Sequence, residues 1–138
     1  LSGLQMPTRK ERIAPYCMNL IYYVMAWFLL ARTPLHPMVP AFMAGATVAL
    51  LLTTLITLRW KISAHLVGIG GACGALLALG SVHQVPVVVP FAIAIGVAGL
   101  LGTARLLSSD HTPGQVYTGF LVGLVCTFTC AQFVWPVV

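Results

Sequence analysis

Apolar residues run along this chain in five long blocks that are separated by short polar links. The blocks are Pro15–Ala31, Met38–Leu58, His65–Ser81, Pro86–Ala104 and Val116–Val138. Each block is close to the ~20 residues that a helix needs to cross a bilayer. Because polar residues do not alternate with apolar ones inside the blocks, a membrane β-barrel is excluded. The pattern predicts an all-α integral membrane helical bundle of about five transmembrane helices, in a single domain over residues 1–138.

The short links between the blocks predict the topology. Prolines at positions 34, 37, 86 and 113 stand at or near the expected helix starts, where a missing N–H costs least. Short links join antiparallel neighbours, so successive links lie on alternate sides of the membrane. The N-terminal segment and the links 59–64 and 105–115 then share one side, here called face A. The links 32–37 and 83–85 lie on the other side, called face B.

The composition shows that a bilayer is the solvent that fits this chain. Of its 138 residues, 59% are hydrophobic and only 7% are charged, whereas a soluble domain carries about 25% charged residues. The net charge of +5 comes from scattered cations, which do not form the broad basic face that nucleic-acid binding requires. Anionic lipid headgroups or phosphate groups are the expected partners. The four cysteines lie in apolar blocks and are interpreted as packing residues rather than metal ligands or a disulfide.

Small residues are concentrated in the last three blocks. GxxxG pairs occur at residues 70–74 and 119–123, and glycine recurs at every third position from 96 to 102. Such positions let helix backbones approach closely in lipid. We therefore expect close helix contacts at all three places.

The charged residues are divided unevenly between the two faces. Face A holds eight of the nine charged side chains, and Arg32 is the one on face B. Ser63, His65 and His111 lie at the level of the face A charges. The tendency of Lys and Arg to collect on one side of a membrane explains the cations, but it does not explain two histidines, a serine and Asp110. Charges near an apolar region are costly and tend to mark function, so a functional site is expected at face A.

These residue types suit phosphate chemistry. The arginine guanidinium matches phosphate oxygens in a fork. Ser63 is the expected N-cap of the helix that begins near His65, and a helix N-terminus offers free N–H groups to an anion. Two histidines supply a nucleophile and a general acid. Since the sequence has no carboxylate cluster for magnesium or zinc, we expect metal-free phosphoryl transfer through a phosphohistidine, with no cofactor.

Three segments of the chain resemble, in order, the signatures of the type-2 phosphatidic acid phosphatases. That family carries a basic segment ending Arg-Pro, then Pro-Ser-Gly-His, then Ser-Arg-x5-His-x3-Asp. The second signature corresponds to residues 62–65 (ISAH) and the third to residues 104–115 (ARLLSSDHTPGQ), with the third signature's spacings kept. The first corresponds less closely to residues 9–15 (RKERIAP). The resemblance covers the chain from about Arg9 to Gly123.

The resemblance implies a role for each matching residue. His111 would be the nucleophile, and His65 would be the acid that protonates the leaving oxygen. The phosphate would be held by Arg12, Arg105 and Ser63, with Lys10 or Arg9 helping. The resemblance also implies a membrane lipid substrate, of the polyprenyl diphosphate or phosphatidic acid type, and one more helix upstream. We expect the bacterial inner membrane as the location.

The chain departs from the family pattern at four positions. The proline and glycine of the second signature are Ile62 and Ala64, and the serine of the third is Ala104, which removes one hydroxyl. The final aspartate is Gln115, whose amide can orient the nucleophilic imidazole but adds no charge to stabilise its cation. Branches that resemble dolichyl diphosphatase and glucose-6-phosphatase also carry glutamine here, so this change is compatible with activity.

Other interpretations stay open for these residues and for the chain. Residues 112–115 also fit a capping box with proline at the first helical position, which by itself accounts for Gln115. Asp110 also fits a favourable charge at a helix start, and His65 or His111 alone would fit a buried polar residue. The whole chain also fits a catalytically silent scaffold, a homo-oligomer or an accessory subunit of a membrane complex. A lipid or ion transporter has less support, because the charges lie at helix ends.

Overall fold

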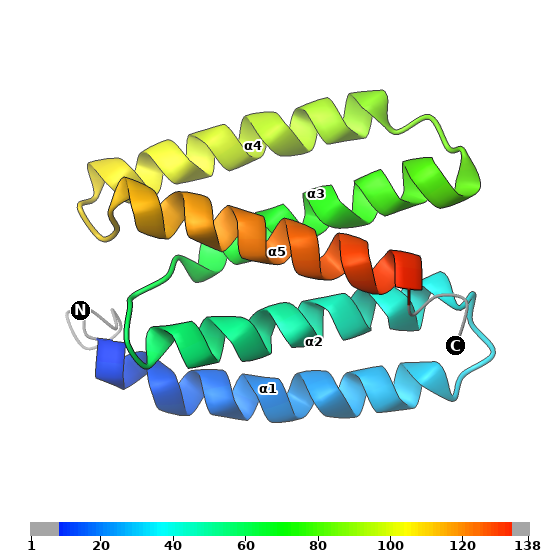
Figure 1. The fold of residues 1–138 in the computed structure, drawn as a ribbon, viewed down its shortest axis with the longest axis horizontal. Coiled ribbons are helices and arrows are strands. Elements are labelled where there is room, and N and C mark those ends of the chain that lie inside the picture. The colour runs from blue at the N-terminus through cyan, green and yellow to red at the C-terminus, as the bar shows by residue number, and fades with distance from the viewer. Residues whose placement is uncertain (1–8, 134–138) are drawn as a thin grey trace.

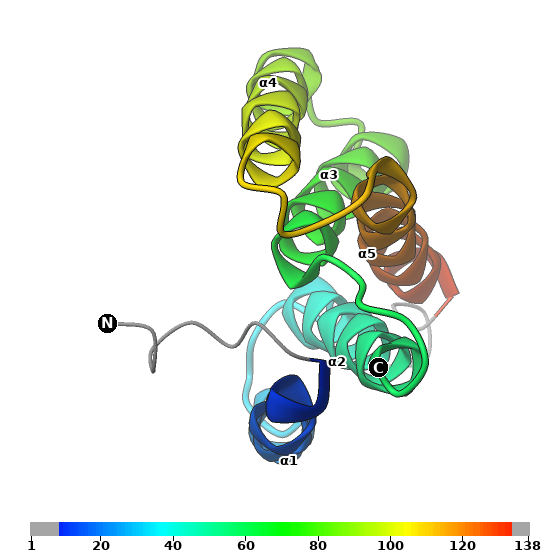
Figure 2. The same cartoon turned by 90° about the vertical axis from the view of Figure 1, so that its left-hand side faces the viewer.

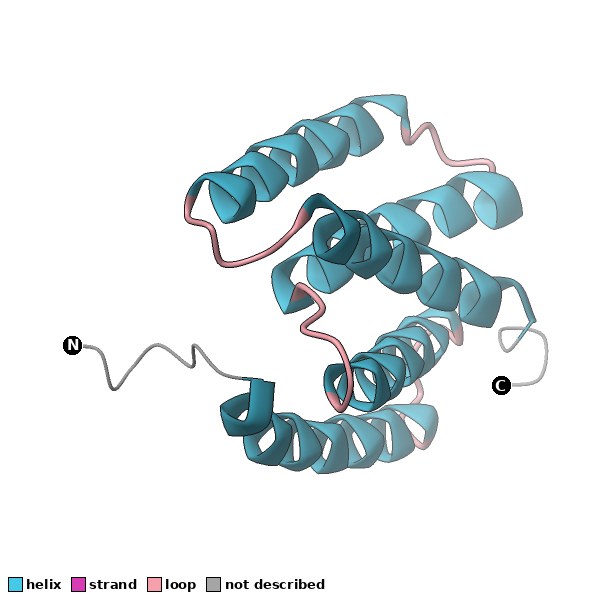
Figure 3. Ribbon diagram, turned by 60° about the vertical axis from the view of Figure 1, so that its left-hand side comes forward, coloured by secondary structure: helices cyan, strands magenta, loops and turns pink. Residues whose placement is uncertain are grey.

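The computed structural model describes residues 9–133, and every regular element in that range is an α-helix (Figure 3). The helices are α1 (Arg9–Ala31), α2 (Met38–Thr57), α3 (Ala64–His83), α4 (Val88–Leu107) and α5 (Pro113–Phe133). All five are long and apolar enough to cross a membrane. For the described residues, the predicted all-α membrane class is confirmed.

The first helix begins at Arg9 rather than at Pro15, so the predicted start was wrong. Pro15 lies inside α1, where its missing N–H removes one intrahelical hydrogen bond. The helix-forming residues 10–12 extend α1 upstream, and Glu11 in the first turn complements the helix dipole. The other described boundaries differ from the predicted ones by at most three residues. The expected end of the last helix at Val138 lies outside the described residues.

The links between the helices lie alternately at the two ends of the bundle. In Figure 1 the start of α1, the α2–α3 link and the α4–α5 link are at the left-hand end, whereas the α1–α2 and α3–α4 links are at the right-hand end. The left-hand end is therefore face A, and the segments that were predicted to share face A do meet at this end. The end-on view in Figure 2 shows α1 and α4 on opposite outer sides, with α2, α3 and α5 between them.

The closest helix pair in the bundle is α3 with α5, as the GxxxG pairs predict. A Cβ atom added at Gly123 would overlap the carbonyl oxygen of Val67 and would lie 2.7 Å from the backbone nitrogen of Gly71. A Cβ atom at Gly70 would likewise overlap the backbone of Phe120. Only glycine lets the two backbones approach this closely, so this interface aligns the starts of α3 and α5.

The glycine repeat of α4 does not form the close contact that was expected. A Cβ atom at Gly96 or Gly99 would meet no atom within 4 Å, while one at Gly102 would lie 3.4 Å from Cγ1 of Val116. The reason is that α4 packs mainly on α3 and only briefly on α5. Most of the repeat is therefore uncovered within the described bundle.

Polar residues in the last turns of α2 bond to their own helix. The hydroxyl groups of Thr53, Thr54 and Thr57 donate to carbonyl oxygens four residues earlier, at 2.7, 2.8 and 2.7 Å. In a bilayer each polar group must find a partner inside the protein, and these groups do. Their hydrogen bonds give the three threonines a structural role.

Face B carries a separate group of polar side chains. The rings of His36 and His83 meet edge to face with their centroids 5.1 Å apart, which joins the α1–α2 and α3–α4 links. The guanidinium of Arg32 lies 4.0 Å from the ring centroid of Phe28, as suits an interfacial anchor. His83 is thus at the opposite end of the bundle from His65 and His111.

Candidate functional site

Three segments far apart in the sequence form the candidate site at face A: the first turns of α1, the α2–α3 link and the α4–α5 link (Figures 1 and 2). A backbone hydrogen bond joins the two links, because the Ser63 N–H donates to the Gln115 carbonyl oxygen at 3.4 Å. A Cβ atom at Gly119 would lie 2.6 Å from the Ser63 carbonyl oxygen. The link before α3 is therefore held against the first turns of α5, which places the second and third motifs side by side.

Arg105, which belongs to the segment that matches the third signature, contacts His65 of the segment that matches the second. Its Nη2 lies 3.0 Å from Nε2 of His65, and its Nη1 lies 3.6 Å from Oδ2 of Asp110. Arginine has donors only, so Nε2 of His65 is the acceptor in this contact. Both branches of the guanidinium thus have partners within the protein.

The α4–α5 link follows a tight path that is set by local hydrogen bonds. Ser109 has a positive φ of 57°, a conformation that is uncommon for residues other than glycine. On one side of it, the Ser108 hydroxyl donates to Oδ2 of Asp110 at 2.9 Å. These bonds hold the Asp110 carboxylate beside Arg105 and immediately before His111.

The capping box proposed for residues 112–115 is confirmed by reciprocal bonds. The Thr112 N–H donates to Oε1 of Gln115 at 3.0 Å, and the Gln115 N–H lies 3.4 Å from the Thr112 hydroxyl oxygen. Pro113 is the first residue of α5, where its missing N–H is harmless. The box ends the link and starts α5 two residues after His111, so it fixes where that imidazole lies.

His111 is 6% exposed, yet it borders an open cavity of about 600 Å³. The cavity is lined by Lys61, Leu106, Ser109, Asp110, His111, Thr112, Pro113 and Gln115. Within the described structure, Nδ1 of His111 is buried and has no hydrogen-bond partner. An unpaired buried nitrogen is costly, and in a native structure it calls for an explanation such as a catalytic role or a bound water.

Burial lowers the pKa of His111 below its usual value, and the positive charges of Arg12 and Lys61 lower that pKa further. Hydrogen bonding to the Gln115 side chain and to the Lys61 backbone raises the pKa, but to a smaller extent. His111 is therefore neutral at physiological pH, with a lone pair on its ring. The Gln115 side chain caps α5, as the capping interpretation predicts, and it also bonds to the imidazole, the contact that the resemblance implies.

None of the four expected phosphate-binding residues is among the residues that line this cavity. Arg12 acts electrostatically on His111, so α1 does bring it close. Lys10 is exposed on the first turn of α1 and, among the described residues, makes no hydrogen bond or ion pair with this cluster. Ser63 precedes α3 as expected, but its hydroxyl makes no capping bond, and it is completely buried with no described partner. The expected capping by the Ser63 side chain was therefore wrong, because close packing on α5 turns the residue inward.

Two members of the cluster were not among the expected site residues. Lys61 lines the cavity, and Asp110 pairs with Arg105. The Ser108 hydroxyl chiefly, with Lys61 and Arg105, holds the pKa of Asp110 below its usual value. Their position in the sequence could have identified them, because both residues stand in face A links, within two residues of a residue that matches one of the signatures. In the described part of the chain, no group of three His, Cys, Asp or Glu side chains could hold a metal ion.

The lowered pKa of His111 predicts that acid destabilises the bundle. Above about pH 6.5 the imidazole is neutral in both the folded and the unfolded chain. Below that pH the unfolded chain binds a proton that the folded protein resists, so stability falls until the pH passes the folded pKa. We expect a lower melting temperature at pH 5.5 than at pH 7.5 in detergent. The drop should be smaller in His111→Gln, and an equal drop in both proteins would contradict this assignment.

No family model matches this chain, and neither a curated protein nor a solved structure matches it. The likeness to the phosphatidic acid phosphatases therefore rests on the three segments quoted above. Of the residues in those segments, His65, Arg105 and His111 come together at face A, and Arg12 lies close enough for its charge to act on His111.

Proposed function

We propose that this protein is a membrane phosphatase that hydrolyses a lipid-linked phosphate or diphosphate through a phosphohistidine. The observation that carries the proposal is the contact of Arg105 with His65, beside the open cavity that His111 borders. Arg105, Arg12 and Lys61 supply positive charge for a phosphate group. Face A lies at helix ends, where a lipid headgroup meets water while its tail stays in the bilayer.

In the proposed reaction a ring nitrogen of His111 attacks phosphorus, and the bond between phosphorus and the leaving oxygen breaks. The electron pair of that bond goes to the leaving oxygen, which takes a proton from His65. Water then attacks the phosphohistidine, and the neutral His65 accepts the proton that the water loses. Inorganic phosphate leaves, and both histidines return to their starting states. The low pKa of His111 suits the first step, because a neutral imidazole is required.

Substrate binding has to rearrange the guanidinium of Arg105. In this structure Arg105 donates to Nε2 of His65, so this nitrogen carries no proton to give. A phosphate dianion attracts the guanidinium in a charge-assisted pair and leaves Nε2 free to be protonated. The dianion also favours the protonated form of His65. Binding would thus convert the acceptor histidine into the acid of the first step.

Replacing Asp110 by asparagine should improve the binding of substrate. The carboxylate holds one branch of Arg105 and lines the same cavity, so it competes with phosphate and repels it. We expect KM to fall about two- to fivefold, with the difference shrinking at high salt because exposed charges are screened. Glu11→Gln, an exposed acid on α1, is the matched control. A higher KM in Asp110→Asn would show instead that the carboxylate positions Arg105 for the substrate.

A second candidate is a phosphate-binding membrane scaffold without catalysis. It is favoured by the capping box, which occupies Oε1 of Gln115, and by the buried hydroxyl of Ser63. In this arrangement neither the Gln115 side chain nor the Ser63 side chain is fully available to a ligand. The cavity lined by Lys61 would then hold a lipid phosphate, while the imidazole of His111 would only contribute to packing.

The deciding experiment measures phosphate release from a polyprenyl diphosphate and from phosphatidic acid by the purified protein, with a chelator present. The proposal expects release, together with an acid-labile and alkali-stable phosphoprotein that can be trapped early in turnover. The preferred lipid would identify the substrate. Folded protein that binds these lipids without releasing phosphate would exclude the phosphatase and support the scaffold.

A further inference from the structure

Beside α4 the bundle has an apolar groove that the chemistry of face A does not use. The groove has a volume of about 380 Å³, with Leu66 of α3, α4 and α5 as its walls. The groove follows α4 from Leu106 back to Ile95, a separation of eleven residues. At ~1.5 Å per residue this is a length of about 16 Å. It exists because α4 and α5 separate after a brief contact, as Figure 1 shows.

One residue joins this groove to the site at face A. Leu106 lines both the groove and the cavity that His111 borders. The two spaces therefore adjoin at this side chain, one lined by Lys61, Asp110 and His111 and the other mostly by apolar residues. Together they suit an amphiphile with a phosphate head, because the Lys61 ammonium complements the phosphate and the apolar groove complements a hydrocarbon chain.

We propose that the groove between α4 and α5 holds one hydrocarbon chain of the lipid whose phosphate lies at His111. This inference rests on the proposed function and narrows its substrate class to lipids that present a single chain to the protein, as a prenyl or alkyl phosphate does. Because Gly99 has no side chain, the groove is open at this position. The space that its side chain would occupy is empty, since a Cβ atom there would meet nothing within 4 Å. Further along, Phe120 of α5 forms part of the opposite wall.

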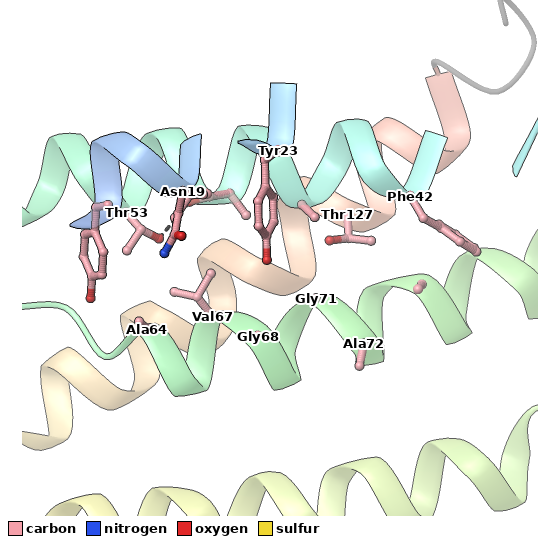
Figure 4. A pocket seen from close by; sticks show the side chains of 15 residues that line it. Asn19, Tyr23, Phe42, Thr53, Ala64, Val67, Gly68, Gly71, Ala72 and Thr127 are labelled. Carbon is pink, nitrogen blue, oxygen red and sulfur yellow. Dashed lines mark hydrogen bonds between the residues drawn. The ribbon is translucent and has the colours of Figure 1, made fainter. Parts of the chain in front are cut away.

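A competing position for the chain is a cavity on the other side of α3. That cavity has a volume of about 460 Å³ and lies between α1, α2 and α3. Figure 4 shows Asn19, Tyr23 and Thr53 facing it across from Gly68 of α3, so polar groups stand on its wall. It shares no lining residue with the cavity at His111. For these two reasons the hydrocarbon chain is assigned to the α4–α5 groove.

Three glycines allow a matched test, because a Cβ atom at each would meet no atom within 4 Å. Gly99 lies in the groove, Gly68 lies in the competing cavity, and Gly96 lines neither. Each is replaced by leucine in a separate variant. Hydrolysis of hexadecyl phosphate, whose chain reaches past Gly99, is compared with hydrolysis of butyl phosphate, whose chain is too short.

Gly99→Leu should lower kcat/KM for hexadecyl phosphate about tenfold, equivalent to about 1.4 kcal/mol, because the new side chain occupies the path of the hydrocarbon chain. Its activity on butyl phosphate should match that of the wild type. Gly96→Leu and Gly68→Leu should match the wild type on both substrates. A selective loss in Gly68→Leu would overturn the proposal in favour of the competing cavity, and equal activity of all variants would overturn it outright.

A binding measurement separates failure of this inference from failure of the phosphatase. Hexadecyl phosphate with a diazirine in the middle of its chain is bound to the wild-type protein and photolysed. Crosslinks on α4 and α5 that are lost in Gly99→Leu support the groove, even if no phosphate is ever released. Crosslinks confined to α1, α2 and the facing side of α3 would refute the groove while leaving the phosphatase intact.

Discussion

Replacing His111 by alanine is expected to lower phosphate release by at least about a thousandfold. The reason is that the proposed reaction passes through a covalent bond to this imidazole, and no described neighbour offers a second nucleophile in the same place. The phosphohistidine should also disappear from the trapping experiment. Initial rates with a polyprenyl diphosphate, at saturating substrate and in the presence of a chelator, measure the effect.

The matched control for His111→Ala is His83→Ala. His83 is also a histidine next to a link, but it lies at face B against His36, so its loss should leave the rate unchanged. The comparison is valid only if the melting temperature of His111→Ala stays close to that of the wild type. A variant that is folded and keeps more than a tenth of the activity would exclude His111 as the nucleophile.

Replacing Gly123 by leucine is expected to unfold the bundle or to destabilise it by about 3 kcal/mol or more. A Cβ atom at this position overlaps the Val67 carbonyl oxygen and lies 2.7 Å from the Gly71 nitrogen. Both are backbone atoms, which cannot move aside without separating α3 from α5. Because this helix pair has the closest contact in the bundle, the change would also displace the links that carry the candidate site.

Thermal unfolding in detergent, followed by circular dichroism and size-exclusion chromatography, measures this destabilisation. Gly96→Leu is the control, because a Cβ atom at Gly96 meets nothing within 4 Å. The same glycine-to-leucine change in a membrane helix should therefore be tolerated there. A Gly123→Leu protein that elutes and melts like the wild type would show that α3 and α5 do not pack in this way.

Much of the candidate site was predictable because its residues belong to links and helix ends. The spacing within residues 104–115 placed Arg105 and His111 at the same end of the bundle as His65, and the structure agrees. The capping box was predictable as well, since its hydrogen bonds are local to residues 112–115. Local geometry of this kind follows from neighbouring residues alone.

Other features of the site depended on how side chains point after packing. Ser63 stands where it was expected, yet its hydroxyl is buried against α5 instead of capping α3. The pairing of Arg105 with Asp110 requires the tight turn at Ser109, which no sequence pattern indicated. Lys61 borders the cavity because two links that are distant in the sequence meet.

For the described residues, the sequence by itself determined the number of helices, the approximate position of each and the end of the bundle at which each link lies. A bilayer requires every backbone polar group to be paired within the spanning segment, so a long apolar block can only be a helix of about 20 residues. The tertiary structure alone decided which side of each helix meets a neighbour. The sequence of a nearly uniform apolar helix does not indicate which of its sides packs on a neighbour, because packing in lipid depends on shape rather than on hydrophobicity. For this reason the glycines of α5 form a close contact, whereas the similar repeat of α4 leaves a groove.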